Sequence, residues 1–230
     1  MPAADDAVVA SWQANAAAWT GAVRDGLIAS RRITGPALIE ILRERAPARV
    51  LDLGCGEGWL TRALAPMGIA VVGVDASAPL IDAARAAGGG SFLVRDYAAI
   101  AAGETTLPLA DAIVCNFSLL GLAPVDRLLA AVPHLLDPAA PRAALIVQTL
   151  HPHAGCGDAP YRDGWRTETW SGFGEGFVQP APWYFRTLES WTALLTRSGL
   201  WLTDMREPPN PDTGRPASLI LVAEPVRDAG

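Results

Sequence analysis

The sequence predicts an α/β domain in which helices cover both faces of a mostly parallel sheet. Two observations support this fold class. Short apolar runs alternate with helical runs through the middle of the chain, and the apolar runs are continuous, as in strands buried on both faces. Right-handed crossovers between such strands give a doubly wound sheet.

The pattern assigns each element in turn. We expect strands, helices between them, and a final helix followed by two strands, at these positions: strands 49–53, 70–74, 91–95, 112–117 and 142–150; helices 58–66, 79–87 and 124–136; helix 187–198 with strands 200–206 and 218–224. The proline-rich connection between the last two strands is too short for a helical crossover, which predicts an antiparallel hairpin.

The two remaining segments differ in character. The first 45 residues are helical in pattern, with a second helix expected at 36–45 and Pro36 in its first turn. Residues 151–186 follow neither period, but they contain eight aromatic residues. Disordered segments are poor in aromatics, so we expect an ordered insertion that covers part of the sheet.

Composition narrows the function classes. The net charge is −6 and all 18 basic residues are arginine, which excludes lysine chemistry and disfavours a basic nucleic-acid surface. Neither a membrane span nor a signal peptide is recognisable, so we expect a soluble, cytoplasmic protein. The three cysteines form no disulfide framework, and Cys55 and Cys115 are expected to be small buried residues.

The strongest motif runs from Val50 to Leu60, where a buried strand enters a glycine-rich turn and then a helix. Missing side chains let a ligand approach the backbone, and the helix start presents free N–H groups. A dinucleotide fingerprint has the spacing GxGxxG, but here Gly58 follows Gly56 by two residues and Trp59 takes the third glycine's place. This spacing counts against NAD or FAD.

Polar residues end the next strands. Asp75 ends the second strand, where an acid can accept hydrogen bonds from a ribose diol. Asp96 ends the third strand and can accept from an exocyclic amine such as that of adenine. The fourth strand ends in Asn116 and Phe117 at the same carboxyl edge.

These residues resemble the class I S-adenosylmethionine-dependent methyltransferases. The stretch from Val50 to Gly58 resembles their first motif, DxGxGxG. The chain resembles small bacterial members without assigned substrates and, more distantly, the ubiquinone-pathway O-methyltransferases. The resemblance implies a Rossmann-like, seven-stranded sheet with its last strand antiparallel. It also implies S-adenosylmethionine as cofactor, S-adenosylhomocysteine as product, and these cofactor-binding residues: Arg32, Asp52, Gly54, Cys55, Gly56, Asp75, Ala76, Asp96, Tyr97, Asn116 and Phe117.

Within that set the turn would face the methionine part, Asp75 the ribose, Asp96 and the Tyr97 backbone the adenine, and Asn116 and Phe117 the sulfonium. Arg32, from the pair at 31–32, resembles an arginine that grips the cofactor carboxylate in related enzymes. The alternative is a solvated charge at a helix end. One domain is expected at 1–230, divided as follows: helical cap 1–46, cofactor-binding core 47–150, substrate lid 151–186, and helix with hairpin 187–230.

Methyl transfer from a sulfonium is an in-line displacement that depends mainly on positioning. His151 directly follows the fifth strand and is the candidate base, with a loop-shaping role as the alternative. The run His151, His153, Cys156 and Asp158 also holds zinc-type ligands, but its spacing matches no usual site, so we expect no metal.

Aromatic residues supply the substrate contacts. We expect the acceptor to contact these residues: Trp19, His153, Trp165, Trp170, Trp183 and Tyr184. The alternative is that some only pack the insertion onto the sheet.

The expected reaction is O-methylation of a small molecule, without nucleic-acid or membrane partners. The alternatives are N- or C-methylation of a heteroaromatic metabolite, a non-catalytic cofactor-binding module, a nicotinamide-dependent oxidoreductase and a macromolecular methyltransferase.

Overall fold

The structure, a computed structural model, describes residues 2–226. A seven-stranded sheet forms its centre, in the order β3-β2-β1-β4-β5-β9-β8. The strands have these bounds: β1 Arg49–Leu53, β2 Ala70–Asp75, β3 Ser91–Val94, β4 Ala112–Asn116, β5 Ala144–Thr149, β8 Leu200–Arg206 and β9 Leu219–Pro225. β9 pairs antiparallel with both β5 and β8, whereas the other pairs are parallel. The doubly wound sheet with a reversed last strand is confirmed.

Helices cover both faces of this sheet. Their bounds are α1 Pro2–Ala14, α2 Ala16–Arg24, α3 Arg31–Arg45, α4 Trp59–Leu64, α5 Ala78–Ala87, α6 Tyr97–Ala101, α7 Ala123–Leu135, α8 Pro152–Gly155 and α9 Leu188–Arg197, with a 3₁₀ turn at Ala65–Met67. α7 and α9 bury apolar side chains on one face, and α3 and α4 do so on the other. Side chains alternate along each strand: Leu51 and Leu53 join the first cluster and Val50 joins the second. Within residues 2–226, none of the helices combines the length and apolar character that crossing a bilayer requires.

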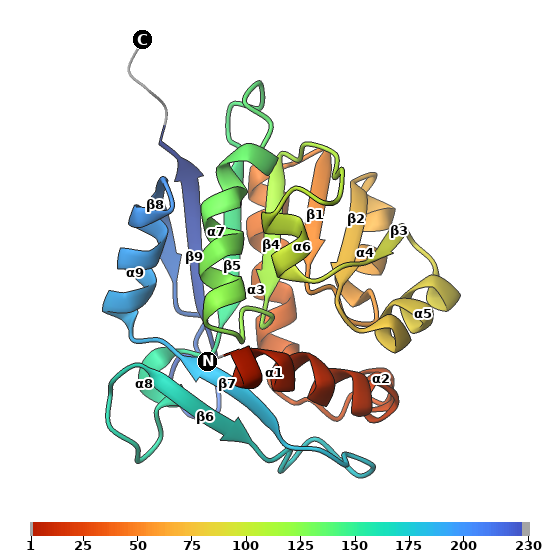
Figure 1. The fold of residues 1–230 in the computed structure, drawn as a ribbon, viewed down its shortest axis with the longest axis vertical. Helices are drawn as coiled ribbons and strands as arrows, with labels where there is room; N and C mark the ends of the chain where they lie inside the picture. Colours follow the sequence, from red (N-terminus) through yellow and green to blue (C-terminus); the bar gives the residue numbers. More distant parts are fainter. Residues whose placement is uncertain (1, 227–230) are drawn as a thin grey trace.

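The remaining elements gather at one edge of the sheet. Figure 1 shows α1, α2 and the two-stranded hairpin β6–β7 lying across the end of the sheet toward which β1 points. β6 spans Gly164–Glu168 and β7 spans Ala181–Phe185. α1 packs on β7, and α2 packs on α5. The carboxyl ends of the parallel strands therefore lie beneath a cover made from the N-terminal helices and the β6–β7 hairpin.

The structure corrects three expectations. The helix expected at 36–45 begins five residues earlier, at Arg31, with Pro36 inside it. Pro36 is the sixth residue of this helix, so the carbonyl oxygen of Arg32, four residues earlier, receives no N–H from position 36. The insertion at 151–186, assigned no regular element, contains α8 and the β6–β7 hairpin. The helix α6 was also not expected; its start is capped by Asp96, whose Oδ1 accepts the Ala99 N–H at 2.7 Å.

Candidate functional site

The glycine turn between β1 and α4 is closely packed. Gly54, Gly56 and Gly58 have φ angles of +80°, +56° and +81°, a region that residues with a Cβ rarely adopt. A Cβ on Gly54 would lie 2.2 Å from the Ser118 Cβ, and one on Gly58 would lie 2.9 Å from the Phe92 ring. Backbone conformation therefore favours glycine at all three positions, and close packing also excludes a side chain at Gly54 and Gly58. The Cys55 side chain is buried, as expected, and packs where a Cβ on Gly73 would stand.

Asp75 holds this turn from the neighbouring strand. Its Oδ2 accepts the Gly56 N–H at 2.9 Å and its Oδ1 accepts the Ser77 N–H at 2.8 Å. Burial raises the pKa of Asp75, and hydrogen bonds from the backbone oppose that rise. Each carboxylate oxygen keeps a second lone pair, so Asp75 can still accept from a ligand hydroxyl. Ala76 follows at the start of the loop into α5.

Asp52 has an acceptor without a partner. The side chain is 1% exposed, and its Oδ2 makes no hydrogen bond within the described residues. Burial, then Asp75 and Glu57, raise the pKa of Asp52 to about 8. A buried polar group without a partner is costly. A ligand with a cationic donor group, bound at the turn, would relieve that cost.

An arginine from α3 reaches the turn. Glu57, in the turn, forms ion pairs with Arg62 and, at 3.7 Å, with Arg31. The Arg31 guanidinium also lies 5.6 Å from the Trp19 ring centroid and 5.0 Å from that of Trp59. Arg32, the residue expected to reach a ligand carboxylate, is exposed instead. The pair at 31–32 was predicted from the sequence, but the choice between the two arginines depends on the phase of α3, which begins at Arg31.

The third and fourth strands bring their predicted residues to the same edge. Asp96 is exposed and caps α6 with one oxygen. The Tyr97 hydroxyl lies 3.1 Å from the Leu53 carbonyl oxygen and 3.3 Å from that of Ser118, so its side chain ties the ends of β1 and β4 together. Asn116 has a buried Oδ1 without a partner among residues 2–226. Phe117 has a φ of +52°, and its N–H donates to the Gln148 carbonyl at 2.7 Å.

Trp19 and Trp170 belong to an aromatic cluster above the turn. The Trp19 Nε1 lies 3.8 Å from where a Cβ on Gly56 would stand. The rings of Trp19 and Trp170 are 6.3 Å apart, and Trp170 is buried with its Nε1 donating to the Gln179 carbonyl at 2.7 Å. The cluster also includes Trp12, Phe173 and Phe177. Trp170 therefore packs the insertion against α1 and α2, and Trp19 is the member that reaches the glycine turn.

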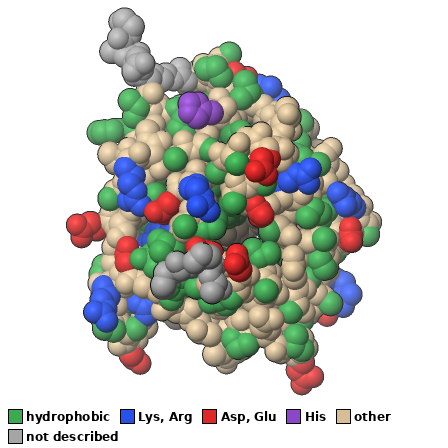
Figure 2. All heavy atoms as spheres, viewed as in Figure 1, with side chains coloured by type: hydrophobic (Ala, Val, Ile, Leu, Met, Phe, Trp, Pro, Cys, Tyr) green, Lys and Arg blue, Asp and Glu red, His purple; other side chains and the backbone are tan. Residues whose placement is uncertain are grey.

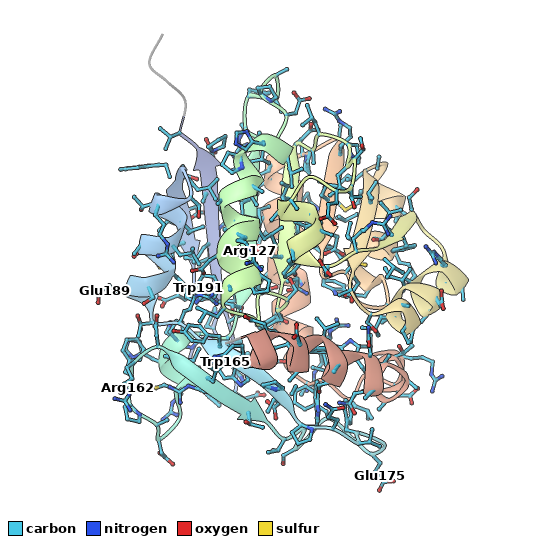
Figure 3. All side chains as sticks on the ribbon, in the orientation of Figure 1. Arg127, Arg162, Trp165, Glu175, Glu189 and Trp191 are labelled. Carbon is cyan, nitrogen blue, oxygen red and sulfur yellow. The ribbon has the colours of Figure 1, made fainter. Side chains whose placement is uncertain are left out.

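The hairpin separates the other aromatic residues. Trp165 pairs with Tyr184 in the register, their rings 5.5 Å apart, while Trp183 pairs with Arg166 on the opposite face. Adjacent residues of one strand point to opposite sides, so Trp183 and Tyr184 face different surroundings. Figure 3 shows how far the insertion extends, with Arg162 and Glu175 at opposite ends of it. The predicted substrate residues thus form separate groups.

His151 lies at the carboxyl end of β5 and is paired. Its Nε2 is 2.6 Å from the Glu207 Oε1, and its side chain is 9% exposed. The His153 ring lies 5.8 Å from the His151 ring and 4.4 Å from the Tyr161 ring, in a stacked arrangement. Glu207 was not among the predicted site residues, because its contact with His151 depends on the register of β5, β9 and β8 rather than on a local motif.

The run from His151 to Asp158, considered above as a zinc site, is not arranged as one among the described residues. Within residues 2–226 no group of three or more His, Cys, Asp or Glu side chains is arranged to hold a metal ion. His151 instead pairs with Glu207, and the Cys156 thiol contacts the His153 carbonyl oxygen at 3.3 Å.

Comparison with known proteins finds similarity to methyltransferases in the central region of the chain. A family model described as "Methyltransferase domain" matches residues 50–139. A ubiquinone biosynthesis O-methyltransferase of Xylella fastidiosa is 35% identical over 123 residues, which cover 50% of this chain and 48% of the relative. The chain thus matches about half the length of this curated relative.

Solved structures extend the similarity to the whole fold. An S-adenosylmethionine-dependent methyltransferase from Mesorhizobium loti is 26% identical, with a TM-score of 0.59 over 82% of this chain and 95% of that one. The DhpI–SAM–HEP complex has a TM-score of 0.66 over 96% of this chain and 97% of that one. At 19% identity, the second similarity concerns the fold alone.

Proposed function

We propose that this chain is a class I S-adenosylmethionine-dependent methyltransferase that methylates a hydroxyl group of a small molecule, and its similarity to such enzymes supports the proposal. The cofactor would lie on the turn from Asp52 to Gly58. The observation that carries this assignment is the buried Asp52 carboxyl, whose Oδ2 has no partner among the described residues. The ammonium group of the cofactor's methionine part is a cationic donor of the kind that this oxygen requires.

Other residues fit the rest of the cofactor. Asp75 retains lone pairs for the two ribose hydroxyls, and its carboxylate is already fixed by two backbone N–H groups. Arg31 lies near the rings of Trp19 and Trp59, and it would meet the cofactor carboxylate. Asp96 and Tyr97 would border the adenine, and Asn116, Phe117 and the backbone of Gly54 and Cys55 would border the methionine and sulfur.

Bound S-adenosylmethionine supplies a methyl group that its sulfonium already activates. The protein's part is then to orient the acceptor, exclude water and, for a hydroxyl, accept a proton. His151 is the proposed base at the carboxyl end of β5. Residues 1–46 and 151–186 would form the cap and the substrate lid, with Trp19 over the turn and Trp165 and Tyr184 together on one hairpin face.

A small acceptor agrees with the surface as well. On the face that Figure 2 shows, acidic and basic side chains are interspersed among hydrophobic ones. Nucleic acids bind to continuous basic surfaces, and the net charge of −6 also opposes them.

The test is a transfer assay with methyl-labelled S-adenosylmethionine and three acceptor classes. Catechols represent hydroxyl acceptors, benzoates represent carboxyl acceptors, and imidazoles represent heteroaromatic nitrogen. We expect label in the hydroxyl class. Label confined to imidazoles would contradict O-methylation, and cofactor binding without label in any class would favour a non-catalytic module.

A further inference from the structure

The pairing of His151 with Glu207 has the geometry of an oriented base. We propose that Glu207 is a positioning residue that fixes His151 with its Nδ1 free to accept the proton of a weakly acidic hydroxyl. This inference rests on the proposed function and narrows its substrate class to acceptors that still carry their proton at neutral pH.

The sheet register brings the two residues together. β9 runs antiparallel to β5 with Leu219 opposite Thr149, and β8 pairs with β9 so that Arg206 lies opposite Ile220. The connection at 207–218 therefore begins and ends level with the carboxyl end of β5. Glu207 is its first residue, and His151 lies two residues beyond Thr149. The contact joins two side chains that are 56 positions apart.

Two contacts fix the imidazole. The Nε2–Oε1 distance of 2.6 Å assigns the Nε2 proton to the hydrogen bond with the carboxylate, because a carboxylate can only accept. Stacking against His153 holds the plane of the ring. Nδ1 makes no hydrogen bond with any residue from 2 to 226. The lone pair of that nitrogen is therefore the basic position of the ring.

The groups in contact with the His151 ring favour its role as a base. Glu207 faces His151 from the β8–β9 connection, and the His153 ring, the other titratable group in contact, faces it from α8. A carboxylate partner stabilises the imidazolium that forms when the base takes a proton. Glu207 itself is half-exposed, whereas the imidazole is buried.

In the proposed step, proton transfer to His151 and methyl transfer to the acceptor occur together. The hydroxyl proton of the acceptor passes to Nδ1 while its oxygen forms a bond to the methyl carbon. The bond between that carbon and sulfur breaks, and its electron pair stays on sulfur, which leaves a neutral thioether. The imidazolium, paired with Glu207, then loses its proton to water.

The decisive experiment is NMR of protein labelled with ¹⁵N-histidine, which has only three histidines to assign. We expect the neutral His151 ring of the wild type to carry its proton on Nε2, and Glu207→Ala, which removes the acceptor, to give a mixture of the two neutral tautomers. Asp212→Asn, on the same connection and exposed, is the matched control and should change nothing. A proton on Nδ1 in the wild type, or a Glu207→Ala protein that keeps the wild-type tautomer, would overturn the proposal.

A kinetic arm separates positioning from folding. With a catechol acceptor, Glu207→Gln should lower kcat at least roughly tenfold with KM and thermal stability unchanged, and should shift the pH profile. Turnover of benzoates that is insensitive to Glu207 would count against the hydroxyl class. If the wild type fails to bind S-adenosylmethionine, the proposed function fails, whereas the NMR result still decides the role of Glu207.

Discussion

The Gly56 N–H donates to the Asp75 Oδ2 over 2.9 Å, joining the glycine turn to the end of the neighbouring strand. The conformation of the turn and the direction of the carboxylate are therefore coupled. A ligand that binds to Asp75 meets a carboxylate that is already oriented, so little ordering is needed on binding.

Replacing Asp75 should weaken cofactor binding. We expect Asp75→Ala to reduce S-adenosylhomocysteine affinity roughly 10- to 100-fold, because hydrogen bonds to a charged group contribute about 1.5–3 kcal/mol. Isothermal titration measures this directly. Asp82→Ala, an exposed position on α5, is the control and should bind like the wild type. Equal affinity of Asp75→Ala and wild type would remove Asp75 from the site.

Asp52 should make stability depend on pH. Its pKa is raised from 3.8 to about 8 on folding, so the folded state holds a proton that the unfolded state releases between those values. The contribution of Asp52 to stability is present below pH 3.8 and is lost as the pH rises toward about 8. The free energy of unfolding of the wild type, relative to Asp52→Asn, should fall across this window with a slope approaching about −1.4 kcal/mol per pH unit.

Urea denaturation of both proteins at several pH values measures that slope. The comparison cancels the carboxyl groups that do not interact with Asp52. A difference between wild type and Asp52→Asn that stays constant from pH 4 to 8 would show that Asp52 is ionised throughout.

The two neighbouring arginines should differ. Arg31 contacts Glu57, Trp19 and Trp59, whereas Arg32 is exposed. We expect Arg31→Ala to weaken S-adenosylhomocysteine binding about tenfold or more, and Arg32→Ala to have little effect. A larger loss in Arg32→Ala would restore the assignment made from sequence. Equal, negligible losses would place the carboxylate contact elsewhere.

Asn15 should fasten the insertion to the N-terminal helices. This fully buried side chain accepts the Val178 N–H at 2.8 Å and donates to the Gln179 carbonyl at 2.6 Å. Asn15→Ala leaves the Val178 N–H unpaired, at about 1–3 kcal/mol, whereas the Gln179 carbonyl keeps its bond from the Trp170 Nε1. Hydrogen exchange around residues 170–180 should accelerate, while Asp6→Ala, exposed on α1, should not change it. Unchanged protection in Asn15→Ala would show that the aromatic cluster alone holds the insertion.

His151 should affect turnover rather than cofactor affinity. We expect His151→Ala to lower kcat about 10²-fold or more and to leave S-adenosylmethionine affinity near the wild-type value. His134→Ala is the matched control, because His134 is exposed on α7. Steady-state kinetics with the acceptor found in the labelling screen would measure both. Full activity of His151→Ala would leave it the loop-shaping role.

The central sheet could be predicted from sequence because its signals are local. β1 and β8 begin and end where the apolar runs predict, and the spacing of Gly54, Gly56 and Gly58 follows from positive φ angles and close packing. The β6–β7 hairpin could not, since prolines and glycines interrupt its strands and its pairing spans a long loop. Its strands are stabilised by contacts with α1 and the loop after β4, such as the bond from the Tyr184 N–H to the Leu120 carbonyl.

The site was predictable only in part for a similar reason. Asp52 and Asp75 follow from their places at the ends of strands. Glu207 depends on a register between β5, β9 and β8 that no local pattern contains. Arg31 depends on helix phase, which Pro36 obscured. Pairings between distant segments, rather than the strand ends themselves, account for what was missed.

Calorimetric titration of the purified protein with S-adenosylmethionine, S-adenosylhomocysteine, NADH and FAD measures directly which cofactor the glycine turn binds. We expect saturable binding of the two adenosyl compounds at one site, lost together in Asp75→Ala, and no binding of NADH or FAD. Binding of NADH or FAD instead of the adenosyl compounds would show that the turn does not bind S-adenosylmethionine.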